Sequence, residues 1–259
     1  MLLRRARPPA SGVSRQSDAS IRGSQKFSLT SVIVPVRDET PDVAGSFARF
    51  GRDPDCELLI ADGGNSPATR AAFREVGARV LAHEGTRGAR LAAAAREARG
   101  DVFFFVHADS KPPDGSLELI RRTLDGGADA GAFSLEYEEG GPRMRWIAWW
   151  ANRRSALARL PLGDQGIFCR RDAYGRSGGF RDLPICDDLD FVLRLRRVGR
   201  FVLRPERTRA SPRRYLAAGA ARQVLRNWMI MCGYFAGIAP ETLARWYDPS
   251  ASSRANRGT

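Results

Sequence analysis

The sequence predicts an α/β fold in which a mostly parallel sheet is flanked by helices. Short apolar runs with the length and composition of buried strands occur at 30–36, 57–61 and 102–106. Stretches that suit helices follow the first two runs and precede the third, at 42–51, 66–77 and 86–99. This alternation indicates βαβ units, and sheets built from such units bind ligands beyond the carboxyl ends of their strands.

The second half of the chain is predicted to be less regular. A strand, a Trp-rich helix, a Gly-rich region, a second helix, short strands and a last amphipathic helix are expected at 129–137, 142–159, 163–180, 187–199, 200–210 and 216–236. No internal repeat or low-complexity linker interrupts the chain. We therefore expect a single domain over 27–247, with a first half to about 136 and an elaborated second half from 137.

The composition suits a globular protein. The 259 residues are 43% hydrophobic and 27% charged, which excludes a wholly disordered chain, a collagen-like fibre and a disulfide-stapled mini-domain. The cysteines lie far apart and form no C-x-x-C pair. We expect reduced thiols in or near the core of a cytoplasmic protein, and neither a zinc site nor disulfides. They are Cys56, Cys169, Cys186 and Cys232.

The chain is strongly basic, with a formal net charge of +13. Residues 1–26 are predicted to be a disordered basic leader, and 248–259 a disordered tail. The longest uncharged apolar stretch, 227–240, is shorter than the roughly 20 residues of a transmembrane helix. The N-terminus also lacks the apolar segment of a signal peptide. The arginine excess leaves a non-catalytic binder of nucleic acid or a membrane surface as one alternative, although no specific nucleic-acid motif is present.

Polar residues follow each of the three predicted strands. Arg37-Asp-Glu39 follows the first, Asp62-Gly-Gly the second, and His107-Ala-Asp109 the third. Asp109 offers a hard oxygen ligand that suits Mg²⁺ or Mn²⁺ beside a diphosphate. His107 is expected on the same side of the strand because it precedes Asp109 by two residues. This convergence predicts a ligand site at one edge of the sheet.

Two further segments carry groups suited to phosphate binding and proton transfer. Arg87-Gly-Ala-Arg90 opens a predicted helix, where guanidinium and backbone N–H groups can hold phosphate. Asp187, Asp188 and Asp190 crowd the start of another helix, which suits a general base as well as helix capping. Tight glycine-containing loops at 163–166 and 178–180 flank this cluster, and five arginines within 204–214 can face a diphosphate.

Taken in order, these motifs resemble family 2 glycosyltransferases, and more narrowly the subgroup associated with arsenosugar biosynthesis. The resemblance covers roughly residues 30–247. It also includes Gly131-Ala-Phe133, Gly163-Asp-Gln-Gly-Ile-Phe168 and Ser211-Pro-Arg-Arg-Tyr215. It implies a GT-A fold, a nucleotide-diphospho-sugar donor with a UDP-sugar favoured, a divalent cation (Mn²⁺ or Mg²⁺) and inversion at the anomeric carbon.

The resemblance also implies roles for individual residues. The nucleotide and its diphosphate would be contacted by Pro35, Arg37, Glu39, Asp62, Arg87 and Arg90. Asp109 matches the last acid of the family's metal motif, and His107 replaces the first. Asp188 falls on the catalytic base, with Asp187 beside it. The acceptor or the diphosphate would be contacted by Asp164, Gln165, Asp190, Arg213 and Arg214.

Two features of the sequence leave alternatives open. A nucleotidyltransferase on a similar sheet is one, but such enzymes carry a Gly-rich loop after the first strand, where this chain has Pro35-Val-Arg-Asp-Glu39. Trp146, Trp149 and Trp150 share one face of a predicted helix that arginines flank. These rings would pack in the core, line an acceptor pocket, or lie at the inner face of a membrane. The sequence specifies no sugar, acceptor or oligomeric state.

Overall fold

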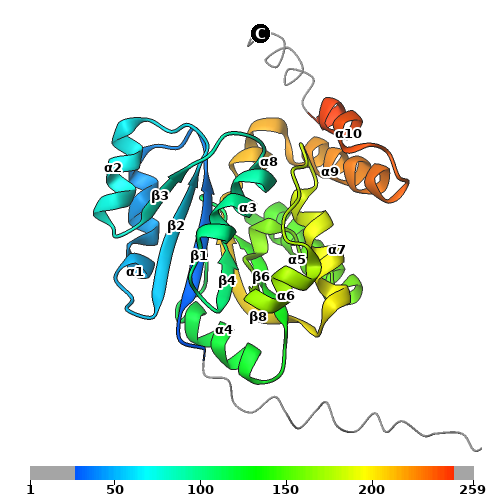
Figure 1. The fold of residues 1–259 in the computed structure, drawn as a ribbon. Coiled ribbons are helices and arrows are strands. Elements are labelled where there is room, and N and C mark those ends of the chain that lie inside the picture. Colours follow the sequence, from blue (N-terminus) through cyan, green and yellow to red (C-terminus); the bar gives the residue numbers. More distant parts are fainter. Residues whose placement is uncertain (1–26, 248–259) are drawn as a thin grey trace, which may run out of the picture.

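An eight-stranded mixed sheet forms the centre of the computed structural model, which describes residues 27–247 (Figure 1). The strand order is β3-β2-β1-β4-β7-β6-β8-β5. The strands are β1 (Thr30–Val36), β2 (Cys56–Asp62), β3 (Arg79–Ala82), β4 (Val102–Phe105), β5 (Ser110–Lys111), β6 (Ala130–Tyr137), β7 (Ile167–Arg170) and β8 (Phe201–Ala210). The predicted basic leader and tail lie outside the described residues.

The first four strands are parallel and place the site. β1 pairs with β2 on one side and with β4 on the other, so the chain moves outward to β3 and then returns across β1. This reversal leaves a crevice between the loops after β1 and β4, where open α/β sheets bind ligands. The loop after β4 carries His107 and Asp109.

The other strands make the sheet mixed. β7 is antiparallel to β4 and β6, β6 and β8 are parallel, and two-residue β5 is antiparallel to β8. β3 and β7 were not expected from the sequence. β8 is one ten-residue strand instead of short strands, and its pairing with β6 shifts register between Phe133 and Ser134.

Helices cover both faces of the sheet. The α-helices are α1 (Ala48–Gly51), α2 (Pro67–Glu75), α3 (Arg87–Glu97), α4 (Ser116–Asp125), α5 (Gly141–Ala158), α6 (Arg171–Ser177), α7 (Asp187–Val198), α8 (Arg213–Ala218), α9 (Ala220–Phe235) and α10 (Pro240–Tyr247). Two short 3₁₀ turns, Pro41–Phe47 and Gly163–Gln165, complete the set. The predicted helix at 42–51 is thus a 3₁₀ turn followed by α1. The one predicted at 216–236 breaks at Gly219, whose φ of 81° ends α8.

Consecutive phenylalanines in β4 serve two core layers. Phe104 packs with Phe47 and Phe50 in the layer under α1, α2 and α4. Phe103 and Phe105 point the other way, into the layer under α3, α6 and α7. The alternation follows from the period of two in a strand, and each buried ring contributes about 2–3 kcal/mol. The Phe-rich strand is therefore fixed from both faces, which holds the loop behind it.

The four cysteines are free thiols. Cys169 and Cys186 are buried and Cys56 is partly buried, whereas Cys232 is exposed on α9, contrary to the expected position in or near the core. Within residues 27–247, none of the helices combines the length and the apolar character needed to cross a bilayer.

Candidate functional site

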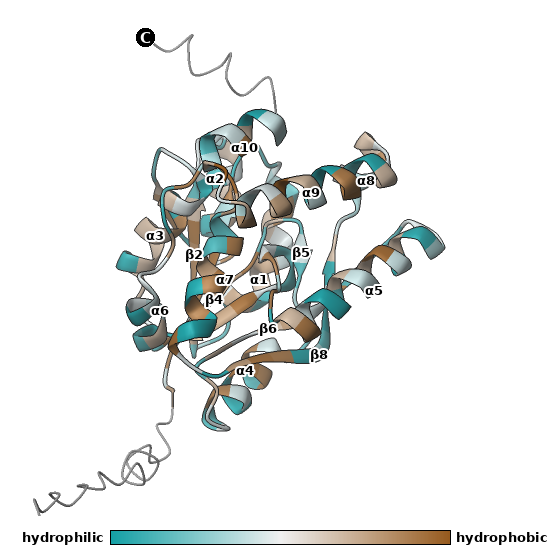
Figure 2. Cartoon of the chain, turned by 90° about the vertical axis from the view of Figure 1, so that its right-hand side faces the viewer, coloured by the Kyte–Doolittle hydropathy of each residue, from teal (hydrophilic) through white to brown (hydrophobic). Residues whose placement is uncertain are grey.

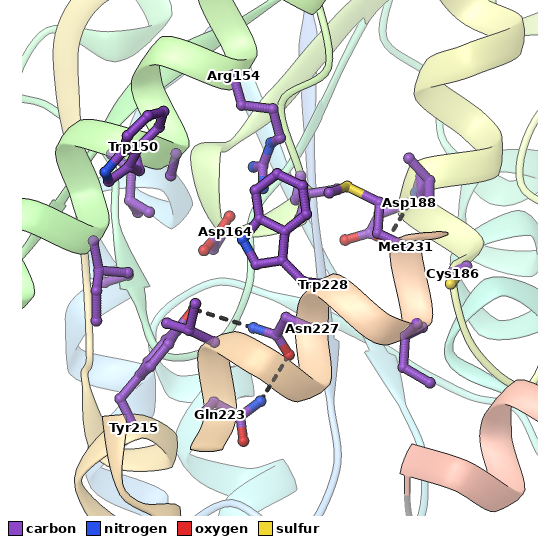
Figure 3. A pocket seen from close by; sticks show the side chains of 18 of the residues that line it. Trp150, Arg154, Asp164, Cys186, Asp188, Tyr215, Gln223, Asn227, Trp228 and Met231 are labelled. Atoms are coloured by element: carbon purple, nitrogen blue, oxygen red, sulfur yellow. Dashed lines mark hydrogen bonds between the residues drawn. The ribbon is translucent and has the colours of Figure 1, made fainter. Parts of the chain in front are cut away.

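A cavity of about 1050 Å³ opens between α5, α7 and α9, beyond the loop that follows β4 (Figure 3). Its inner end is polar and includes Arg87, His107, Asp109, Asp164 and Asp188. The residues predicted at the first and second strand ends do not line it. With Asp187, the structure thus brings six of the predicted site residues to one cavity, and of the predicted nucleotide contacts only Arg87 and Asp109 line it.

A partly buried ion pair joins α3 and α7 at the inner end of the cavity. The Arg87 Nε and Nη2 atoms donate to the two carboxylate oxygens of Asp187 over 2.9 and 2.6 Å. Burial alone would lower the pKa of Arg87, but Asp187 and Asp188 outweigh it and raise that pKa, so the guanidinium stays charged. Gly88 permits this approach, since a Cβ there would lie 2.1 Å from the Arg181 carbonyl oxygen.

Asp188 faces the cavity beside this ion pair. Its Oδ2 accepts a hydrogen bond from the Gly163 N–H over 2.9 Å and lies 3.6 Å from the Arg87 Nη2. Its Oδ1 accepts from the Leu189 N–H over 2.8 Å. Burial alone would raise the pKa of Asp188, but Arg87 and the Gly163 N–H hold it below its usual value. The carboxylate is therefore ionised at neutral pH and fixed in orientation.

His107 fills the space between these groups. Its Nε2 lies 3.2 Å from the Arg87 Nη1, and a Cβ on Gly163 would lie 2.4 Å from the same nitrogen. β4 ends at Phe105, so the expectation that His107 and Asp109 share one side of a strand is wrong. Both nevertheless line the cavity, because they lie in the turn that follows the strand.

Asp164 carries a carboxylate oxygen that its neighbours leave unpaired. Its Oδ1 is buried without a hydrogen-bond partner. Burial raises its pKa to about 6, with further contributions from Asp188 and Asp109, while Arg154 opposes the shift. Figure 3 shows Asp164 and Arg154 facing the same space. The carboxylates of Asp109, Asp164 and Asp188 thus repel one another at one end of the cavity, and a bound ligand or cation can relieve this repulsion.

Asp109 is fixed through its backbone: its carbonyl oxygen accepts a hydrogen bond from the Ser211 N–H over 3.1 Å, which ties the loop after β4 to the end of β8. No cluster of three metal-ligating side chains is preformed in residues 27–247. A catalytic Mg²⁺ or Mn²⁺ generally takes only one or two carboxylates and completes its shell with phosphate oxygens and water. Asp109, which lines the cavity near Asp164, fits such an ion as a single carboxylate ligand.

The predicted nucleotide contacts after β1 and β2 form a neighbouring group. Asp62 is buried and accepts from the Asn65 backbone N–H over 2.9 Å and from the Arg70 Nε over 2.6 Å. Burial would raise the pKa of Asp62, but the bonds from Asn65 and Arg70 lower it. The Glu39 N–H donates to the Asn65 Oδ1 over 3.0 Å. The two loops are therefore held together by their own side chains.

The other predicted donor residues differ in exposure. Arg37 is exposed, beside Asp38 at 3.6 Å. Arg90 is buried, and its Nη1 donates to the Val36 carbonyl oxygen over 3.0 Å, beneath the strand end. Pro35 lies within β1, at the edge of a small pocket that Arg87 also lines. Arg213 lies at the start of α8, with its Nη2 3.9 Å from the Glu39 Oε2.

Two predicted contacts are engaged inside the protein. Gln165 is fully buried, donates to the Phe133 carbonyl oxygen over 3.0 Å and accepts from the Ser155 hydroxyl over 2.7 Å. Asp190 accepts from the Arg194 Nε over 2.9 Å and from the Tyr234 hydroxyl over 3.0 Å. They join α5 and α9, respectively, to the site. The side chain of Arg214 lies outside what the structure describes.

Residues of α9 that line the cavity were not predicted as site residues. Val224, Asn227, Trp228 and Met231 all face it. In Figure 3, Asn227 donates to the Tyr215 hydroxyl, over 3.2 Å, and accepts from Gln223. The spacing of three and four residues between them is a signal of one helix face that the sequence already contained. The interpretation of Trp146, Trp149 and Trp150 as core is wrong, since 48–59% of each is exposed, whereas pocket lining is confirmed.

The Glycosyl transferase family 2 model matches residues 31–183, more than half of the chain. No curated protein sequence matches this chain. Among solved structures, a mannosyltransferase from Pyrobaculum calidifontis in complex with GDP-Man and Mn²⁺ is similar, with a TM-score of 0.56 and 18% identity. The match covers 71% of this chain and 56% of the mannosyltransferase, less than two thirds of its length.

A second similar structure is the glucosyl-3-phosphoglycerate synthase of Mycobacterium tuberculosis, in complex with Mn²⁺, UDP and glucosyl-3-phosphoglycerate. Its TM-score is 0.51 at 20% identity, and the match covers 79% of this chain and 80% of the synthase. At these identities the likeness shows the fold. The predicted α/β class and its GT-A form are confirmed, with helices on both faces of the central sheet.

Proposed function

Because the chain belongs to glycosyl transferase family 2, we propose that it is an inverting enzyme that moves a sugar from a nucleotide-diphospho-sugar to an acceptor hydroxyl. The observation that carries this proposal is Asp188, an oriented carboxylate that faces the cavity beside the strand-end loops. Family membership supports glycosyl transfer over the two alternatives, nucleotidyl transfer and non-catalytic binding. The narrower arsenosugar-associated subgroup stays a proposal.

In this mechanism Asp188 accepts the proton of the acceptor hydroxyl as its oxygen attacks the anomeric carbon. The carbon–oxygen bond to the diphosphate breaks on the opposite face, so the configuration inverts. The Gly163 N–H and Arg87 hold the base in place, and Asp187 holds Arg87. General-base catalysis of this kind typically contributes about 10²–10⁴-fold to the rate. Asp164 lies in the same cavity and is proposed to orient the acceptor hydroxyl.

A divalent cation, Mn²⁺ or Mg²⁺, would neutralise charge that develops on the leaving diphosphate. Asp109 is the residue proposed to hold it, with His107 beside it. His107 is not a simple replacement for a second acid of the metal motif, because its Nε2 lies beside the Arg87 guanidinium. Mn²⁺ in the complexes of both similar enzymes supports the proposal.

The nucleotide is proposed to lie over the loops after β1 and β2, contacted by Glu39 and Asp62, with Arg37 and Arg213 near the diphosphate. The proximity of Arg213 to Glu39 supports this arrangement. We favour a UDP-sugar, as in the complex of the mycobacterial synthase, although the mannosyltransferase complex holds GDP-Man. Residues 27–136 are called the donor half below, and residues 137–247 the acceptor half.

The test is a thermal-shift panel of UDP, GDP and their sugars, with and without Mn²⁺. Ligands that bind only the folded protein raise its melting temperature, and at equal concentration the tighter ligand raises it more. We expect one nucleotide to stabilise the protein only with Mn²⁺, and Asp109→Ala to remove that effect without lowering the ligand-free melting temperature. If every polyanion stabilises the protein alike, in a way that depends on salt and not on Mn²⁺, the result would instead support a non-catalytic binder of nucleic acid or a membrane surface.

We also propose a cytoplasmic enzyme that touches the inner face of the membrane through α5. The three exposed tryptophans of that helix and its four arginines, with no acidic residue, support this contact. The test is sedimentation with vesicles of phosphatidylcholine, with and without phosphatidylglycerol, using residues 27–250. We expect binding to the anionic vesicles alone, and loss of binding when the three tryptophans become serine in a variant that still folds.

A further inference from the structure

The cavity changes character along its length. Its inner end carries the charged groups Asp109, Asp164 and Asp188. Its outer part is lined mainly by large apolar side chains of α5 and α9, among them Trp146, Trp149, Trp150, Leu157, Trp228 and Met231. In Figure 3, Trp150 and Trp228 reach toward the cavity from different helices. A ligand that fills the cavity therefore meets carboxylates at one end and rings at the other.

These two helices and the neighbouring α8 and α10 carry the exposed large apolar side chains of the described part of the chain. All ten large hydrophobic side chains that are exposed there lie on α5, α8, α9 and α10. Figure 2 shows hydrophobic segments along α5, α8 and α9. They are Trp146, Trp149, Trp150, Leu157, Leu216, Leu225, Trp228, Met229, Phe235 and Trp246. Apolar surface gathered at the mouth of a cavity typically marks a binding site for an apolar partner.

The arginines that line the cavity are poorly placed for an anionic acceptor. The Arg153 guanidinium lies over the Trp149 ring, 5.5 Å from its centroid. The Arg154 Nε donates to the Leu160 carbonyl oxygen over 3.3 Å, and its charge acts on Asp164. Arg87 is held by Asp187. A small phosphorylated or carboxylated acceptor would find each of these cations already engaged, with three carboxylates beside it.

We propose that the acceptor is an amphiphilic alcohol, whose hydroxyl reaches Asp188 and whose long apolar tail lies between α5 and α9. This inference rests on the proposed function, because it names the acceptor class of that same site. The occupant is a lipid drawn from an anionic membrane surface. α5 and α9 carry arginines and no acidic residue, which complements such a surface, and the apolar lining is continuous with the exposed tryptophans.

The test uses the tryptophans as reporters, since four of the five line the cavity. Butan-1-ol and octan-1-ol are titrated into the protein while its fluorescence is followed. We expect saturable binding with a blue shift, and about fourfold tighter binding per added methylene. Octan-1-ol, which has four more methylenes, should then bind roughly 250-fold more tightly than butan-1-ol. Glycerol 3-phosphate, a small anionic alcohol, should give no shift.

Two variants on α9 complete the test. Trp228→Ala removes a ring that lines the cavity, and it should weaken octan-1-ol binding about tenfold or more. Leu225→Ala is the matched control, because Leu225 is exposed on the same helix and does not line the cavity. Circular dichroism verifies that both variants fold. Equal affinity for both alcohols, equal effects of both variants, or preferred binding of glycerol 3-phosphate overturns the inference.

The nucleotide panel is run on the same preparations, so the two proposals fail separately. Nucleotide binding without chain-length dependence leaves a glycosyltransferase with a different acceptor. Chain-length dependence without any nucleotide binding overturns the proposed transfer and therefore the role of the cavity as an acceptor site. With both present, octan-1-ol, the donor and Mn²⁺ should yield an octyl glycoside detectable by mass spectrometry.

Discussion

In the donor half the loops after β1 and β2 are closed by their own side chains, whereas the acceptor half leaves polar and apolar groups facing a cavity. In the first, Asp62 is saturated by Asn65 and Arg70. In the second, the Asp164 Oδ1 has no partner, and the tryptophans of α5 are about half exposed. The two loops around Asp62 are thus preorganised by their own side chains, while Asp164 and the tryptophans of α5 stay open to a substrate.

The largest effect is expected from a substitution of the proposed base, which lies where the two halves meet. Asp188→Asn should lower turnover by about 10²–10⁴-fold while nucleotide binding is kept, because the variant loses the proton acceptor but not the donor loops. Steady-state kinetics and the thermal-shift panel measure the two effects separately. Asp172→Asn, an exposed carboxylate of α6 paired with Arg176, is the control and should act like the parent. Full activity of Asp188→Asn would show that another carboxylate of the cluster is the base.

A second substitution targets the packing that aligns the base. Gly163→Ala places a Cβ 2.4 Å from the His107 Nε2 and 3.1 Å from the Asp188 Oδ2, so both side chains must shift. We expect a loss of about 1–3 kcal/mol in the free energy of unfolding, and lower turnover. Gly175→Ala is the contrast, since a Cβ there meets nothing within 4 Å inside α6. It should stabilise by about 0.5–1 kcal/mol; equal effects would refute the steric account.

The third prediction concerns a saturated carboxylate of the donor half. Asp62→Asn should destabilise the protein by about 2 kcal/mol at pH 7, because it removes the ion pair with Arg70 and charge-assisted bonds. The folded-state pKa of Asp62 is lowered, so its stabilisation is present above the unfolded pKa and is lost as the pH falls through the folded value. Urea titrations at pH 7 and below pH 4 should show the difference between variant and parent shrink in acid.

The acceptor half should respond to pH in the opposite sense. The pKa of Asp164 is raised to about 6 in the folded protein, so ionisation destabilises the fold as the pH rises from about 4 to 6. Asp164→Asn should therefore stabilise the metal-free protein by about 2 kcal/mol at pH 8, with no gain below pH 4, while turnover falls. Stabilisation that is the same at both pH values would assign the effect to packing instead of charge.

The sequence predicted those strands, helices and site residues that depend on local patterns of apolar and charged residues. The strand over 30–36, the polar residues at the strand ends and the helix that starts at Asp187 follow from short apolar runs and local charge. The partnership of Arg87 and Asp187 could not be predicted, because the two lie 100 residues apart. β7 was hidden in a Gly-rich region, since its four residues are too few to show a period. The half-exposure of the tryptophans depends on the cavity beside them.

That separation of Arg87 from Asp187 has a kinetic consequence. The loops of the donor half lie close in the chain and can form early, but the ion pair that positions the base requires closure of a long loop. We therefore expect catalytic competence to appear late in refolding, after nucleotide binding has recovered. A destabilised variant in α7 would expose its amides to hydrogen exchange before those of β1 do, so activity would be lost while most of the fold persists.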